Sequence, residues 1–252
     1  MCTIGAIFLS KDEYFLFKNK DFSRPDYTDR IKSTDKIWGA EGLETFSADT
    51  NVEDIYSGLS IGANKHGLLV ADSHVQITSP KASNYDILVE TALNQGHDIE
   101  TALLALNSRI SNYPSWWGNL ILADRTGTAA VEIRDSNLMV ERNPSRITRT
   151  NHQHLHGSKD GLENNNSNSY GRYEWITKGL KHAQTLDALK SILASHDTKT
   201  AHGAPTGICN HTYSQTVCSY ILHAKLGIVT LHSLQGQPCL HSPYSKQTLF
   251  AS

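Results

Sequence analysis

The chain is 252 residues long and carries 23 Lys and Arg against 25 Asp and Glu, a formal net charge of −2. This balance argues against an electrostatic nucleic-acid binder, and no apolar run approaches the ~20 residues of a membrane span. We therefore expect one domain, residues 1–252, with a core large enough to fold without disulfide staples and with neither nucleic acid nor membrane among its partners.

The N-terminal third predicts two β-hairpins separated by a long loop. A polar turn at residues 10–13 divides an apolar run from an aromatic one, which puts Cys2 at the free end of the first strand. Residues 22–55 are polar and irregular, and we expect a loop there, of a length that is often functional. The expected strands lie at residues 3–8, 14–18, 58–63 and 67–72.

The rest of the chain alternates pairs of helices with further hairpins. Asp98, Ser169 and Thr185 stand where they can cap helices. Since strands and helices both come in pairs, we predict a layered α+β fold with antiparallel sheets. The expected helices span 87–93, 102–110, 169–180 and 186–193, the expected strands 119–123, 129–133, 138–141, 216–222 and 226–231, and the expected polar loops 157–168 and 196–213.

Cys2 stands directly behind Met1. Aminopeptidases remove an initiator methionine before a small residue, and the mature chain would then begin with a thiol and a free α-amine. An unperturbed thiol titrates near ~8.5 and an α-amine near ~7.7–8.0, so the two can exchange a proton near neutral pH. Cys2 is therefore a candidate nucleophile that carries its own base, on the condition that Met1 is removed; the alternative is a second residue with no chemical role.

The α-ammonium of such a nucleophile needs an acceptor, and a carboxylate suits it. A hairpin that turns at residues 10–13 brings residues 19–21 back beside residue 2. Asp21 is therefore the candidate acceptor, and the alternative is an ordinary loop carboxylate.

These residues, in this order, resemble a known enzyme group. Cys2-Thr3 followed by Lys18-Asn19-Lys20-Asp21 is similar to the opening of the cysteine N-terminal nucleophile (Ntn) hydrolases. Among them, the chain resembles the isopenicillin N acyltransferase and choloylglycine hydrolase (bile salt hydrolase and penicillin V acylase) families, with Lys18 where Arg is usual. The resemblance continues in segments 62–69, 118–124, 129–132, 149–152, 169–173 and 236–239.

The resemblance implies a four-layer αββα sandwich and a set of roles. Cys2 would attack a carbonyl and form a thioester, and Asp21 would hold its amine. Asn151 would donate its side-chain amide to the oxyanion, and Arg172 would favour the thiolate. The alternative for Asn151 is a turn residue and for Arg172 a surface helix residue.

Three further positions would support the site. Lys18 keeps the charge of the usual Arg but loses its planar fork of donors, and Asn19 matches the family pattern. His74 stands where a second residue assists the oxyanion through its backbone.

The implied activity is an amidohydrolase or acyltransferase that acts on a small acyl amide or acyl thioester, at a linear C–N bond, through an acyl-Cys2 intermediate. No cofactor is expected, and a homo-oligomer is possible. The alternatives are a non-catalytic binding protein on the same scaffold and a cysteine dipeptidase-like peptidase.

Metal binding is the remaining class to weigh. The four cysteines (Cys2, Cys209, Cys218 and Cys239) form no CxxC pair, which argues against a zinc site, and we expect reduced thiols in the cytoplasm and no metal. His152, His154 and His156 alternate, but a solvated loop is the preferred interpretation. Trp38, Trp116 and Trp117 either line an acyl pocket or belong to the core.

Overall fold

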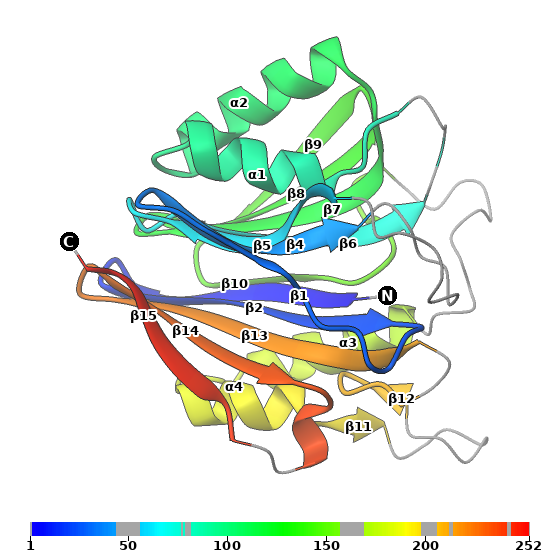
Figure 1. The fold of residues 1–252 in the computed structure, drawn as a ribbon, viewed down its shortest axis with the longest axis vertical. Helices are drawn as coiled ribbons and strands as arrows, with labels where there is room; N and C mark the ends of the chain where they lie inside the picture. Colours follow the sequence, from blue (N-terminus) through cyan, green and yellow to red (C-terminus); the bar gives the residue numbers. More distant parts are fainter. Residues whose placement is uncertain are drawn as a thin grey trace.

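The computed structural model describes residues 2–43, 56–76, 78, 82–156, 169–197, 206–211, 214–240 and 243–251. Two antiparallel sheets stack face to face, and two helices cover the outer face of each (Figure 1). This is the αββα arrangement that the resemblance implied, and the predicted α+β class is confirmed. Among the described residues no helix combines the length and the apolar character that crossing a membrane requires.

The six-stranded sheet begins with Cys2. The predicted first hairpin is confirmed, with Ile4 opposite Lys18 and Cys2 opposite Lys20. A strand that the sequence did not predict, β10 (Arg146–Arg149), pairs with the other side of β1 (Cys2–Ser10). In sheet order the strands are β10 (Arg146–Arg149), β1 (Cys2–Ser10), β2 (Glu13–Phe22), β13 (Gln215–Lys225), β14 (Ile228–Gln235) and β15 (Ser245–Ala251).

The seven-stranded sheet corrects one expectation. Residues 22–55 were expected to form a loop, but β3 and β4 lie in this range, and residues 44–55 are outside the described part. Trp38 and Ala40 are buried between the sheets and Ile37 beneath the helices, which is the alternation of a strand buried on both faces. In order the strands are β3 (Ile31–Ser33), β4 (Ile37–Leu43), β5 (Tyr56–Asn64), β6 (Leu69–Gln76), β7 (Ser115–Asp124), β8 (Gly127–Asp135) and β9 (Asn137–Asn143).

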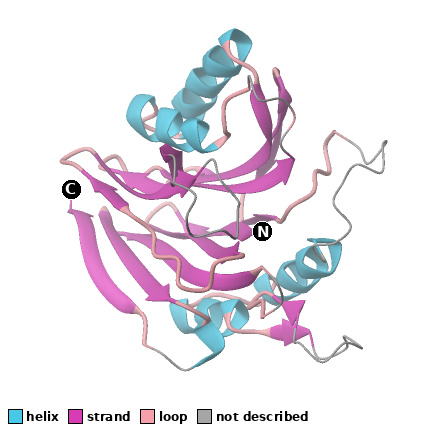
Figure 2. Ribbon diagram, turned by 45° about the vertical axis from the view of Figure 1, so that its right-hand side comes forward, coloured by secondary structure: helices cyan, strands magenta, loops and turns pink. Residues whose placement is uncertain are grey.

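The four predicted helices are present (Figure 2). α1 (Asp86–Gln95) and α2 (Ile99–Asn112) cover the seven-stranded sheet, and α3 (Ser169–Leu180) and α4 (Leu186–Leu193) cover the other. Two of the predicted caps form: the Asp98 side chain accepts from Thr101 N–H at 2.8 Å, and Thr185 Oγ1 accepts from Ala188 N–H at 3.1 Å.

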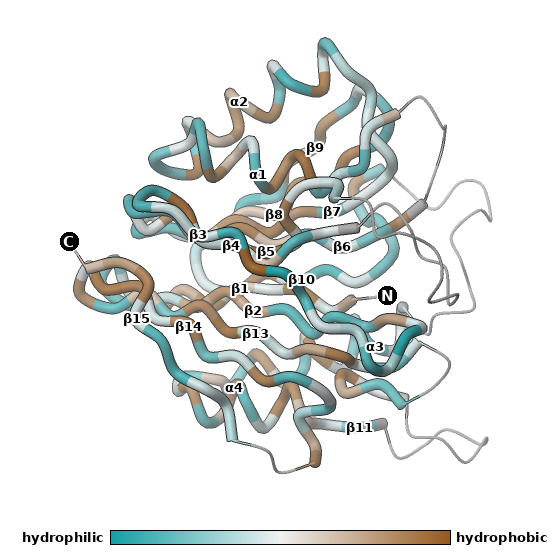
Figure 3. The backbone as a smooth tube through the Cα atoms, viewed as in Figure 1, coloured by the Kyte–Doolittle hydropathy of each residue, from teal (hydrophilic) through white to brown (hydrophobic). Residues whose placement is uncertain are grey.

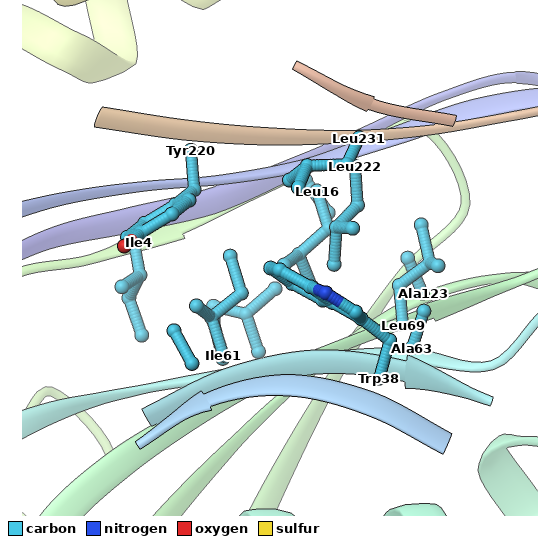
Figure 4. Close-up of a cluster of buried hydrophobic side chains, with 14 of the residues drawn as sticks. Ile4, Leu16, Trp38, Ile61, Ala63, Leu69, Ala123, Tyr220, Leu222 and Leu231 are labelled. Atoms are coloured by element: carbon cyan, nitrogen blue, oxygen red, sulfur yellow. The ribbon is translucent and has the colours of Figure 1, made fainter. Parts of the chain in front are cut away.

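The main core lies between the two sheets, where apolar stretches of both gather (Figure 3). Trp38 and Ile61 rise from one sheet toward Tyr220 and Leu222 of the other (Figure 4). Trp116 packs with α1 and α2 in a second core. Two of the three tryptophans considered for an acyl pocket are therefore core residues.

The segment expected as a polar loop at 196–213 contains two short paired strands, β11 (His196–Asp197) and β12 (Thr206–Gly207). They lie beside α3 and α4 in Figure 1. Ile208, Cys209 and Asn210 are buried directly after β12. The loop expectation is therefore wrong for this part, while residues 198–205, 212 and 213, and the expected loop at 157–168, fall outside the described residues.

Candidate active site

Cys2 opens β1, and its backbone is held from two directions. Its N–H donates a hydrogen bond to Asn151 Oδ1 (3.1 Å), and its carbonyl oxygen accepts one from Arg172 Nη1 (2.8 Å). Cys2 is buried, with 8% of its surface exposed. The structure therefore brings together three of the four residues that the resemblance named as catalytic, from β1, the segment that follows β10, and α3.

Arg172 fixes the orientation of the Asn151 amide. Its guanidinium donates to Thr3 Oγ1 (2.8 Å) and to Asn151 Oδ1 (2.6 Å). Since a guanidinium only donates, the Asn151 atom that faces it must be the oxygen. The other end, Nδ2, then donates to the His74 carbonyl at 2.6 Å. Arg172 is only 1% exposed, so the surface-helix alternative for this residue is wrong.

The first turn of α3 holds the chain on both sides of Asn151. Ser169 Oγ accepts from the Asn151 backbone N–H (2.8 Å) and bonds to Thr150 Oγ1 (2.9 Å) and His152 Nδ1 (2.7 Å). Asn119 Nδ2 donates to the carbonyls on either side of Asn151, those of Thr150 and His152, at 3.0 Å each. Hydrogen bonds therefore fix the backbone on both sides of Asn151. The alternative of an ordinary turn residue does not account for this number of contacts.

Glu132 holds the next residues of the same segment. Its carboxylate, which is fully buried, accepts from the backbone N–H groups of His154 (2.9 and 3.0 Å) and Leu155 (2.8 Å). It also accepts from Arg149 Nε at 2.8 Å. One carboxylate on β8 therefore fixes the chain before and after Asn151.

The histidine run departs from the expected solvated loop. His152 is 1% exposed and Gln153 is 2% exposed, because their side chains turn inward onto α3 and the seven-stranded sheet. Burial, followed by the charges of His154, Arg149 and Arg172, lowers the pKa of His152 to about 3. His154 is exposed, as a solvated loop would require.

Asp21 lies near the end of β2, one residue beyond the partner of Cys2. It is buried and accepts from Thr216 Oγ1 at 2.8 Å. Burial raises the pKa of Asp21 above its ordinary value, although Arg172, the terminal ammonium group, Thr216 and Asn210 all act to lower it. Burial likewise lowers the pKa of Arg172, and the charges of Asp21 and Cys2 oppose that change. Asp21 therefore belongs to the same buried charge cluster as Cys2 and Arg172.

Lys18 uses all three of its donors in a buried pair. Nζ donates to the Ser60 carbonyl (3.0 Å) and to the Asp72 carbonyl (2.9 Å) and carboxylate (2.7 Å). Burial alone would lower the pKa of Lys18, but the charges of Asp72 and Cys2 outweigh it and the pKa is raised. Lys18 is therefore a buried cation within electrostatic range of Cys2, without the bidentate fork of an arginine.

The two other supporting positions act through different groups. Asn19 points to the opposite face of β2 and donates to the Leu193 and Ile208 carbonyls, both at 2.9 Å, so its side chain is not at the thiol. His74 contributes its backbone carbonyl, which accepts from Asn151. Burial, followed by the terminal ammonium charge, lowers the pKa of the His74 ring to about 3, so the ring is neutral at neutral pH.

Several residues that hold the site were not named as site residues from the sequence. Glu132, Asn119 and Thr216 are buried polar residues of β8, β7 and β13, and a polar side chain within a mostly buried strand was the available clue. Ser169 was expected as a helix cap and as part of segment 169–173, which resembles the family. Three cavities among the described residues are lined by other side chains than Cys2, Asn151 and Arg172.

Comparisons with known proteins address the family and the fold of the chain. The family model described as acyl-coenzyme A:6-aminopenicillanic acid acyl-transferase matches residues 8–218. No curated protein sequence matches the chain.

Solved structures show the same fold at low identity. Penicillin V acylase from Agrobacterium tumefaciens is 12% identical, with a TM-score of 0.54 over 93% of this chain and 83% of that one. The Caenorhabditis elegans ortholog of N-acylethanolamine-hydrolyzing acid amidase is 13% identical, with a TM-score of 0.54 over 88% and 92%. A mutant of conjugated bile acid hydrolase from Clostridium perfringens is 12% identical, with a TM-score of 0.51 over 98% and 96%. The family model spans most of the chain, so the protein belongs to the acyl-coenzyme A:6-aminopenicillanic acid acyl-transferase family and is an enzyme of the Ntn type.

Proposed function

We propose that the mature chain, with Met1 removed, is an N-terminal-cysteine amidohydrolase or acyltransferase that acts on a linear C–N amide or a thioester of a small acyl compound. The observation that carries the proposal is the three-way contact among Cys2, Asn151 and Arg172, in which one residue supplies a thiol and an N-terminus and the other two contact its backbone.

Removal of Met1 turns the Cys2 backbone nitrogen into the α-amine. That nitrogen has an acceptor at 3.1 Å in Asn151 Oδ1, and Asp21 supplies a nearby negative charge. The α-amine takes the proton of the Cys2 thiol. The resulting thiolate attacks the substrate carbonyl, and the S–C bond forms. It returns the proton to the leaving nitrogen as the C–N bond breaks, which leaves acyl-Cys2 and a free amine.

The oxyanion formed by that attack needs donors. Asn151 Nδ2 carries two hydrogens, of which the His74 carbonyl uses one, so one remains for the oxyanion. Arg172 acts mainly through Asn151, because it fixes which end of the amide faces the substrate. Lys18 and Arg172 are both buried cations, and both favour the negative charge of a Cys2 thiolate.

The thioester is then resolved by water or by an amine acceptor, with the α-amine acting again as base. Hydrolysis gives a carboxylic acid, and transfer gives a new amide. Two observations support this substrate class: the family membership, and the need for a carbonyl that reaches a buried thiol at the end of a strand.

The test compares turnover in wild type and three variants on a panel of acyl p-nitroanilides and acyl thioesters. Cys2→Ala is expected to lose activity by at least about 10³-fold, the scale on which losing a nucleophile acts. Cys2→Ser is expected to retain little, since a hydroxyl is the poorer nucleophile. Cys218→Ala, at a buried thiol in the same sheet, is the matched control and is expected to keep wild-type turnover.

Full turnover in Cys2→Ala would overturn the proposal. So would a wild-type protein that binds members of the panel tightly and converts none of them, which is the behaviour of a binding protein on the same scaffold.

A further inference from the structure

Four metal-ligating side chains converge away from the thiol of Cys2. They are His196, Cys209, His211 and Cys239, and their ligand atoms all lie within 4.8 Å of one another. Cys209 is buried and the other three are half-buried. Both imidazoles turn the same ring nitrogen, Nε2, into the cluster.

The distances are near those of a tetrahedral metal site. His211 Nε2 lies 3.0 Å from His196 Nε2, 3.5 Å from Cys209 Sγ and 3.1 Å from Cys239 Sγ. Ordinary Zn–N and Zn–S bond lengths put the ligands of a tetrahedral zinc about 3.3 Å apart for two nitrogens and about 3.6 Å apart for a nitrogen and a sulfur. Small movements of the side chains would therefore enclose one ion.

The ligands come from three separate segments of the chain. His196 begins β11, shortly after α4, Cys209 and His211 follow β12, and Cys239 lies in the short 3-10 helix Pro238–Leu240 after β14. α4 contacts that short helix, and α3 contacts β12. A bound ion would therefore tie three segments together beneath the helical layer of the six-stranded sheet.

We propose that His196, Cys209, His211 and Cys239 form a structural Zn²⁺ site. Two thiolates and two neutral imidazoles satisfy four-coordinate zinc, and the two thiolate charges balance the ion. Four protein ligands leave no open position, so the ion has no direct part in acyl chemistry. The sequence argued against such a site because no two cysteines have CxxC spacing, but the ligands are brought together by the fold.

The proposed zinc site is connected to the charge cluster of Cys2, Asp21 and Arg172 through a single residue, Asn210. Asn210, between two of the ligands, is one of the groups that lower the pKa of Asp21, and its backbone N–H donates to Thr216 Oγ1 (2.9 Å), which donates to Asp21. Asn19 bonds to the Leu193 and Ile208 carbonyls, close in sequence to His196 and Cys209. An ion bound at this cluster would hold the segment that carries Asn210, and Asn210 and Thr216 connect that segment to Asp21.

A disulfide between Cys209 and Cys239 is the competing account of the same cluster. Both sulfurs are free in the structure. A disulfide would also leave unexplained why His211 turns Nε2 toward both sulfurs and why His196 turns its own Nε2 toward that nitrogen. Metal binding uses all four groups, and the two accounts make opposite predictions for the oxidation state of the thiols.

The test is metal analysis of the full-length protein purified without chelator, by inductively coupled plasma mass spectrometry. We expect about one zinc per chain, as a closed four-ligand site requires. Cys209→Ser and His211→Ala are expected to lower the zinc content at least tenfold. Cys218→Ser, at a buried thiol outside the cluster, is expected to keep it.

A second measurement needs no variant. Wild-type protein stripped of metal and titrated with Co²⁺ is expected to develop the visible d–d bands and the sulfur-to-cobalt charge-transfer band of a tetrahedral thiolate site, saturating near one equivalent. Wild-type protein with neither zinc nor this spectrum would overturn the proposal, and so would a Cys209–Cys239 disulfide in peptide maps of protein kept from oxidation. The proposal does not rest on the acyl chemistry, because the metal content is measured without substrate.

Discussion

Glu132 gives the sharpest stability test, because the two carboxylates that bind Arg149 differ in burial. Arg149 Nε bonds to Glu132, which is 0% exposed, and Nη2 bonds to Glu141, whose side chain is 40% exposed. In Glu132→Gln, the new amide must turn its NH₂ toward groups that are themselves donors, and the buried guanidinium of Arg149 keeps only the partly exposed Glu141 as its counter-charge. Breaking a buried pair in this way costs about 3–5 kcal/mol.

The same change at Glu141 is the matched control. A partly exposed pair contributes about 0–1 kcal/mol, so Glu141→Gln is expected to have little effect. For a chain of this size 1 kcal/mol corresponds to roughly 2–4 °C in the unfolding midpoint. Glu132→Gln should therefore lower the midpoint by about 6–20 °C and Glu141→Gln by at most about 4 °C.

Both variants would be melted at neutral pH and followed by circular dichroism. Hydrogen exchange then locates the loss: the backbone amides of His154 and Leu155, which donate to Glu132, are expected to lose protection first. Equal midpoint shifts in the two variants, or unchanged exchange at these amides in Glu132→Gln, would refute the reasoning that Glu132 holds the segment around Asn151.

Three further predictions concern the charges at the site. Arg172→Lys is expected to lower kcat about 10–100-fold with the fold retained, since one ammonium cannot reach Cys2, Thr3 and Asn151 together; near-wild-type kcat would contradict this. Lys18→Met leaves the Asp72 carboxylate buried without its cation and is expected to lower the free energy of unfolding in urea by about 3 kcal/mol. Lys18→Arg keeps the charge and is expected to lower it clearly less. Equal losses of stability in the two variants would show that the charge of Lys18 is not what stabilises this pair. The pKa of His152 is about 3 in the folded protein, below its unfolded value of about 6.5. Its contribution to the free energy of unfolding is therefore complete above pH 6.5 and is lost as the pH falls toward 3, by at most about 1.4 kcal/mol per pH unit. His152→Gln should flatten the profile of stability against pH in that range.

The sequence predicted most of the layers because the strands and helices that build them carry clear periods. Alternation identified the first hairpin, and helix caps such as Asp98 marked the helices. β4 escaped notice because Gly39 and Gly42 interrupt its apolar pattern, and glycine is depleted in strands. β10 was missed because it is four residues long and has an arginine at each end, with only two uncharged residues between them.

Site residues were predictable to the extent that a local spacing or a resemblance reached them. The proximity of Asp21 to Cys2 follows from a hairpin whose turn position can be identified in the sequence. The contacts of Asn151 and Arg172 with Cys2 join residues 149 and 170 positions apart, and no local pattern encodes such a distance. The same limit hid the cluster around His211, whose members are brought together only by the packing of α4, β12 and the short helix that follows β14.

The most direct test of the central claim is to trap the intermediate. Wild-type protein mixed with an excess of an acyl thioester or acyl p-nitroanilide, quenched in acid within one turnover and mapped by peptide mass spectrometry, is expected to carry one acyl group on Cys2, and only on chains that begin with Cys2. An acyl group on another residue, an acylated chain that still carries Met1, or turnover with no acyl adduct would contradict the claim that the N-terminal cysteine is the nucleophile.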